Sequence, residues 1–194
     1  LFARDMITAF FKLFANERIP QPTLRPSLKT VPVGPFNAVM AFLERNRSVL
    51  PETIVQKAVL DNDVVTENIS GWHAMNNYVQ LANYDRQREN IKFLPFTPEV
   101  GLVDHIAADI GSFENDLRQF YGDNQIFISN LTFERDNTLT GGEQRKAAKR
   151  MTDALISYLR SKTQKSEEVV REQLCSIFAN RTWQQYRAPF MQLF

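Results

Sequence analysis

Five of the nine prolines fall in one short stretch near the beginning of the chain, between Pro20 and Pro35. Proline lacks a backbone donor, fixes φ, and biases the residue before it toward extended geometry. A helix or a central strand is therefore excluded over this stretch. Because it also carries several aliphatic side chains, we do not expect a solvated spacer. Residues 18–35 are predicted to form an extended arm that follows an N-terminal helix at residues 1–17 and precedes a helical core at residues 36–194.

Apolar residues recur at helical spacing over most of the remaining chain. This periodicity predicts amphipathic helices at residues 3–17, 36–50, 51–59, 72–88, 97–120, 141–161 and 166–180. The clearest start is Thr97-Pro98-Glu99, which offers a cap residue, a proline in the first turn and an acid near the helix dipole. Gly122 is a typical residue for ending that helix, and the Gly111-Ser112 pair is expected to kink or divide it.

One segment alternates between apolar and polar side chains as a half-buried strand does. Its apolar positions include Ile126, Ile128 and Phe133. We therefore expect one short β-strand or hairpin near residues 125–135. The predicted fold is mainly α: a single domain over residues 1–194, built as a helical bundle of six to seven helices with an extended proline-rich N-terminal arm.

Both ends of the chain are rich in aromatic residues, whereas termini are commonly polar and poorly ordered. Such ends must either pack on the chain's own core or bind a partner. We interpret them, together with two leucines of the arm, as a partner-binding surface. Its predicted residues are Phe2, Phe10, Phe11, Phe14, Leu24, Leu28, Trp183, Tyr186 and Phe190.

The net charge of the whole chain is only +1, so no overall field directs it to nucleic acid or to an anionic membrane. Locally, however, residues 141–165 hold seven basic and two acidic side chains, while acids predominate in the helix predicted at 97–120. Two surfaces of opposite charge favour head-to-tail self-association. A helix carrying such basic residues can also bind RNA. The candidate residues for that alternative are Arg145, Lys146, Lys149, Arg150, Lys162 and Lys165.

Few residues in the chain are suited to catalysis or to metal binding. A single cysteine and two histidines give no zinc-ligand set, no Cys-x-x-Cys motif and no disulfide within the chain, so we predict no metal and no cofactor. His105 and Asp109 lie four residues apart, on one helix face, and form the least implausible catalytic pair. Cys175 falls inside a predicted helix and is expected to be a buried structural thiol.

These observations lead us to expect a particular cellular location and a particular function. No apolar run is long enough to span a membrane, and charges at Arg4, Asp5 and Lys12 interrupt the first apolar run, unlike a signal peptide. An intracellular (cytoplasmic) or virion-like setting is favoured, although four Asn-x-Ser/Thr sequons leave secretion as an alternative. The favoured function is a non-enzymatic structural or assembly protein that binds itself or another protein. Two alternatives stay open: an RNA-binding coat or nucleoprotein, and an enzyme around His105 and Asp109.

Overall fold

The computed structural model describes residues 1–19, 21, 23, 28–34, 36–47, 49–51, 53–133 and 138–194. Over these residues the fold is mainly α, as predicted, with one small parallel sheet. The α-helices are α1 (Phe2–Arg18), α2 (Phe36–Arg47), α3 (Ser70–Ala74), α4 (Tyr78–Gln87), α5 (Pro98–Ala108), α6 (Ile110–Tyr121), α7 (Gly141–Thr163) and α8 (Glu167–Leu193). The strands are β1 (Ala58–Leu60) and β2 (Ile91–Phe93).

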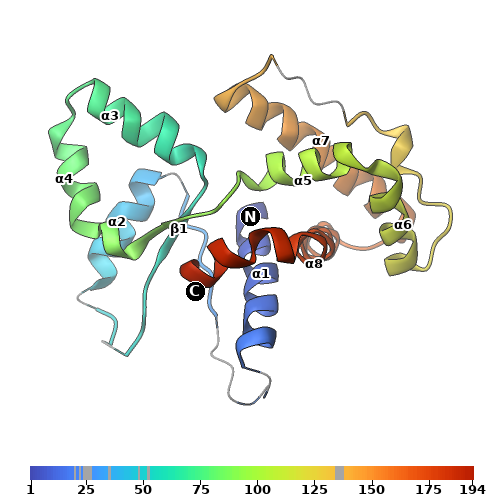
Figure 1. Cartoon of the computed structure of the whole chain (residues 1–194), viewed down its shortest axis with the longest axis horizontal. Helices are drawn as coiled ribbons and strands as arrows, with labels where there is room; N and C mark the ends of the chain where they lie inside the picture. Colours follow the sequence, from blue (N-terminus) through green and yellow to red (C-terminus); the bar gives the residue numbers. More distant parts are fainter. Residues whose placement is uncertain are drawn as a thin grey trace.

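The elements form two groups, which lie side by side in Figure 1. The main lobe contains α1, α5, α6, α7 and α8, with α1 and α8 crossing near its centre. The small lobe contains α2, α3, α4 and the β1–β2 sheet. Buried apolar residues likewise form two clusters, a large one in the main lobe and a cluster of five in the small lobe. The single-domain organisation predicted for residues 1–194 stays a prediction.

Packing between α1 and α8 builds the centre of the main lobe. Met6 and Phe10 of α1 have no exposed surface, and neither has Phe190 of α8. The Phe10 and Phe190 rings stack with centroids 4.0 Å apart and planes inclined by 3°. Helix α8 thus runs thirteen residues further than the predicted end at residue 180, because its last turns bury apolar side chains against α1. It continues through Pro189 although proline removes one backbone hydrogen bond.

The described residues contain eight helices rather than six to seven, because two of the expected helices are each divided and the one expected at residues 51–59 is absent. The helix expected at 72–88 becomes α3 and α4, separated at Asn76, whose φ is +53°. The helix expected at 97–120 is divided at Asp109, two residues before the Gly111-Ser112 pair. Asp109 accepts a hydrogen bond from the Ser112 N–H at 3.0 Å and so caps α6. Gly122 ends α6 with φ +65°, as predicted.

The strand expected near residues 125–135 was wrong for the residues described there. Ile126 and Ile128 are fully buried, but the backbone is irregular and contains a 3-10 turn, Ile128–Asn130. The alternation correctly indicated burial, here against helices rather than beside another strand. Residues 134 and 135 lie outside the described residues.

The helix expected at residues 51–59 was also wrong, because this segment ends in β1. Strand β1 pairs in parallel with β2, with Ala58 opposite Ile91 and Leu60 opposite Phe93. The Leu94 N–H donates to the Leu60 carbonyl at 2.8 Å, which extends the pairing beyond the strands. A partner more than thirty residues away decides this conformation, and local periodicity carries no signal for it.

Candidate functional site

The aromatic residues predicted to bind a partner lie largely within the main lobe's own core. Phe10 contacts the rings of Phe96, Phe178, Trp183 and Phe190. Phe2, Trp183 and Phe190 are buried in this core, and Phe14 and Tyr186 pack half-buried against it. The half-buried Phe11 contacts the rings of Phe14 and Phe194. Of the two ways in which apolar ends can be covered, this structure uses the internal one.

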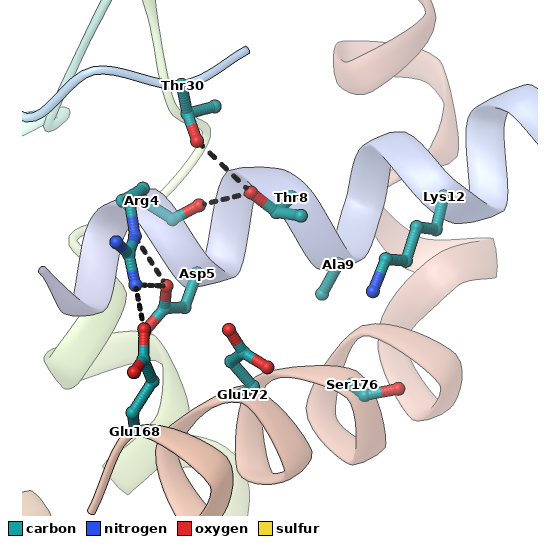
Figure 2. Close-up of a pocket in the computed structure, with 9 residues that line it drawn as sticks. All are labelled: Arg4, Asp5, Thr8, Ala9, Lys12, Thr30, Glu168, Glu172 and Ser176. Carbon is teal, nitrogen blue, oxygen red and sulfur yellow. Dashed lines mark hydrogen bonds and ion pairs between the residues drawn. The ribbon is translucent and has the colours of Figure 1, made fainter. Parts of the chain in front are cut away.

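Residues 28–34 of the proline-rich arm contain neither helix nor strand. Thr30 approaches Thr8 of α1, with the two hydroxyl oxygens 3.5 Å apart, so the arm runs beside α1 (Figure 2). Leu28, a predicted partner-binding residue, is 39% exposed. The other predicted arm residue, Leu24, lies outside the described residues. Leu28 and Val31 of the arm thus remain accessible to solvent.

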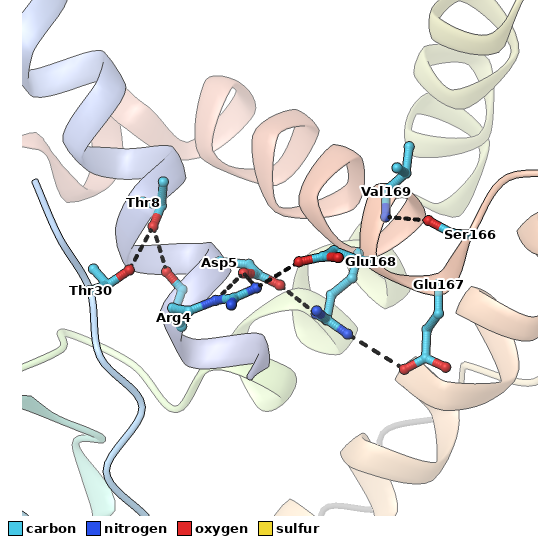
Figure 3. A network of polar contacts seen from close by, with 9 residues as sticks. Arg4, Asp5, Thr8, Thr30, Ser166, Glu167, Glu168 and Val169 are labelled. Carbon is cyan, nitrogen blue, oxygen red and sulfur yellow. Dashed lines mark hydrogen bonds and ion pairs between the residues drawn. The ribbon is translucent and has the colours of Figure 1, made fainter.

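A polar network joins the first turn of α1 to the first turns of α8 (Figure 3). Asp5 is buried and pairs with the buried Arg171 of α8. Arg4 donates to the second carboxylate oxygen of Asp5 at 2.7 Å and lies 3.6 Å from Glu168. The Arg171 guanidinium also reaches Glu167 at 3.4 Å. Burying a charge is tolerated only when it is paired and hydrogen-bonded, and these contacts meet that requirement.

A cavity of about 250 Å³ lies next to this network, between α1 and α8 (Figure 2). Its walls combine cations, carboxylates and hydroxyls, from Arg4, Asp5, Thr8, Lys12, Thr30, Glu168, Glu172 and Ser176. Charges of both signs face it, so it holds no concentrated field of one sign. No nucleophile with an adjacent base lines it, and the cavity therefore offers no catalytic arrangement among the described residues.

His105 and Asp109 are engaged with different groups. The Arg181 Nε–H donates to His105 Nε2 at 3.0 Å, and the His105 ring lies edge-on to Phe113 and Phe178. Burial, followed by the charge of Arg181, lowers the pKa of His105, so this histidine is held as a neutral acceptor. Asp109 caps α6 instead. The structure thus gives both side chains structural roles, and the enzyme alternative gains no support from them.

Cys175 is completely buried in α8. Burial is the main cause that raises the pKa of its thiol well above the usual value, and the nearby Asp5 adds to this. A thiol held in its protonated form is a poor nucleophile and a poor metal ligand. The geometry agrees with the structural role predicted for Cys175.

The six predicted nucleic-acid-binding residues are spread along α7 and the turn after it. Arg145 pairs with Asp63 and lies 3.7 Å from Glu67, so it connects α7 to the small lobe. Lys146 is exposed and pairs with Glu143 at 2.8 Å. Lys149 and Arg150 are exposed and form no ion pair with a described residue. The other two, Lys162 and Lys165, lie over aromatic rings at the far end of α7.

An acidic cluster that no sequence pattern indicated lies where the parallel strands end. Asp61 and Asp63 follow β1, and Glu99 begins α5 shortly after β2. Arg145 from α7 completes the cluster. Burial, then the charges of Asp63 and Glu99, raise the pKa of Asp61 to about 6. Only the parallel pairing brings these residues together, and that pairing carries no local signal.

Replacing Asp61 by asparagine is expected to stabilise the protein above pH 6. A carboxyl group with a raised folded-state pKa contributes stability that is fully present below about pH 3.8 and is lost as the pH rises through about 6. Asparagine does not ionise, so the Asp61→Asn variant does not lose this stability as the pH rises. We expect its free energy of unfolding at pH 7.5 to exceed that of the wild type by about 1–2 kcal/mol, after allowance for partial exposure. Urea denaturation at pH 4 and pH 7.5 measures the difference. Asp85→Asn, at an exposed position on α4, is the control and should show no such pH dependence.

The small lobe leaves large apolar side chains on its surface. Val55 is 80% exposed, and Ile54 is 48% exposed. Both line a groove of about 240 Å³ between the α2–β1 connection and the end of α4, whose other apolar residues are Leu43, Leu50 and Pro51. A second exposed set, at the turn between α3 and α4, consists of Met75, Tyr78 and Val79. Apolar surface gathered in this way is typical of an interaction site.

Comparison with protein-family models, with curated protein sequences and with solved structures finds no match. Among the described residues, no helix is both long enough and apolar enough to cross a membrane. The described side chains also include no group of three or more potential ligands placed to hold a metal ion.

Proposed function

We propose that this chain is a non-enzymatic assembly protein that associates through the groove of the small lobe. The observation that carries the proposal is the exposure of Leu50, Ile54 and Val55 around that groove. Among the described residues, the small lobe's own cluster buries five apolar side chains, and Leu50, Ile54 and Val55 are left exposed within one chain. Covering them on association releases water from apolar surface, which is the main driving force of most protein interfaces.

The occupant that we propose is a second copy of the chain. Two copies related by a two-fold axis would bury the same groove twice, so one apolar patch suffices for both sides. The groove is not the surface that the sequence predicted at the two ends of the chain. At those ends, Phe10 and Phe190 have no exposed area left for a partner. An intracellular or virion-like location is part of the same proposal.

Replacing Val55 by aspartate is expected to weaken the association at least tenfold. The charge would have to be desolvated at the interface, at a cost of more than about 1.4 kcal/mol, whereas a residue 80% exposed in one chain can be replaced without loss of the fold. Light scattering behind a sizing column, at low micromolar concentration, measures the mass of each variant. Wild type should show a discrete multiple of 22.4 kDa, and Val55→Asp should shift toward 22.4 kDa.

Val79→Asp is the matched control, because Val79 is also exposed but lies in the other apolar set. It should keep the mass of the wild type. A wild-type mass of 22.4 kDa would contradict self-association, and equal effects of the two substitutions would show that the groove is not the contact.

A further inference from the structure

The end of the main lobe at the α6–α7 connection combines exposed aromatic rings with lysines. Phe120 and Phe127 are 49% and 44% exposed, although rings of this size are usually covered. Tyr121 and Tyr158 lie beside them and are half-buried. Lys165 is placed over the Tyr121 ring, with its Nζ 5.2 Å from the centroid, and Lys162 over the Tyr158 ring at 5.9 Å. We call these six residues the aromatic–basic surface.

Several contacts hold this surface in one place. The Phe127 N–H donates to the Tyr158 hydroxyl at 2.7 Å, which ties the connection to α7. Arg118 of α6 donates to the Ile126 carbonyl at 2.8 Å, and its guanidinium lies 4.5 Å from the centre of the Phe127 ring. The rings are thus presented by fixed backbone, so a ligand need not order them on binding.

The charges of the surface favour an anionic ligand. Lys162 and Lys165 form no ion pair with a described residue, so both ammonium groups are available. The two acids of α6 are already paired: Glu114 pairs with Arg118 and accepts the Ser129 N–H at 2.9 Å, and Asp116 pairs with Arg181. An apolar protein face would have to desolvate both lysines, whereas a polyanion would pair with them.

We propose that the aromatic–basic surface binds single-stranded nucleic acid, with bases stacked on the exposed Phe120 and Phe127 rings and phosphates paired with Lys162 and Lys165. Every base offers a π-face, so exposed rings between cations bind unpaired strands with little regard to sequence. Bases within a duplex are already stacked and cannot reach the rings. This surface lies on the main lobe and is separate from the groove of the small lobe.

Fluorescence anisotropy with the full chain and a labelled oligouridine of about 12 nucleotides tests the proposal. At about 50 mM salt we expect measurable binding, with a slope of log affinity against log salt of about −1.4 for two phosphate contacts. Phe120→Ala combined with Phe127→Ala should lower the affinity at least about tenfold and leave the salt slope unchanged. Lys162→Gln combined with Lys165→Gln should flatten the slope.

Matched controls replace an exposed ring and an exposed lysine elsewhere, by Phe42→Ala on α2 and Lys29→Gln in the arm. Both should bind as the wild type does, and circular dichroism should show that all variants are folded. The proposal is overturned by any of three results: no binding of the oligouridine, unchanged affinity after removal of both rings, or equal binding of a duplex. Equally tight binding of a polyglutamate peptide would also overturn it, since it would indicate an acidic protein partner.

Discussion

Replacing Phe10 by alanine is expected to lower the free energy of unfolding by about 3–5 kcal/mol, as large-to-small substitutions at fully buried aromatic positions do. Phe10 has no exposed surface, stacks on Phe190 and contacts four further rings of the core. Its removal would leave a cavity at the crossing of α1 and α8, because rings held from several helices cannot all move inward. Such a loss is a large part of the 5–15 kcal/mol typical of a folded domain.

Urea denaturation followed by circular dichroism measures this loss. Phe42→Ala is the control, since Phe42 is 41% exposed on α2 and should cost less than about 1 kcal/mol. A similar cost for both substitutions would contradict the central position of Phe10.

Deletion of residues 1–35 should be more severe still, because it removes α1 entirely; we expect an unfolded chain rather than a smaller folded one.

Replacing Asp5 by alanine is expected to destabilise the protein by about 3–5 kcal/mol, the usual cost of leaving a buried ion without its partner. The substitution would leave the Arg171 guanidinium, whose side chain is only 9% exposed, without its buried carboxylate partner. Its remaining partner, Glu167, lies 3.4 Å away and is itself mostly in solvent, so it replaces Asp5 poorly. The same denaturation measurement applies.

Two comparisons separate the loss of the buried pair from a general effect at this end of α1. Glu168→Ala removes an exposed carboxylate 3.6 Å from Arg4 and should cost less than about 1 kcal/mol. Combining Asp5→Leu with Arg171→Met removes both charges, and it should recover most of the stability. If the double variant is as unstable as Asp5→Ala, the unpaired charge is not the cause.

Much of the fold could be predicted from local pattern. Helices α1, α2 and α7 agree with the periodicity of their apolar residues, because a helix with one buried face has apolar residues at helical spacing in its sequence. Gly122 ends α6 as expected for the same local reason, since a left-handed residue is needed there. The irregular conformation of arm residues 28–34 likewise agrees with proline's fixed φ and missing donor.

Several of the features that failed or were missed depend on a distant partner. Residues 58–60 form a strand because Ile91–Phe93 lie beside them, and the acidic cluster around Asp61 exists only through that pairing. Similarly, nothing local shows that Arg145 reaches across to Asp63. Such contacts join residues separated by 33 to 82 positions, so no short window of the sequence contains both members.

The sequence by itself determined that this chain is mainly helical, that a proline-rich arm follows the first helix, and that its aromatic ends had to be covered by apolar contacts. Only the tertiary structure decided what covers them. Helices α1 and α8 cross at the centre of the main lobe, so Phe10 and Phe190 cover each other. The aromatic ends of the chain therefore pack within its own core. Composition specifies how much apolar surface must be buried, whereas the directions in which the helices cross specify which residues remain outside to meet a partner.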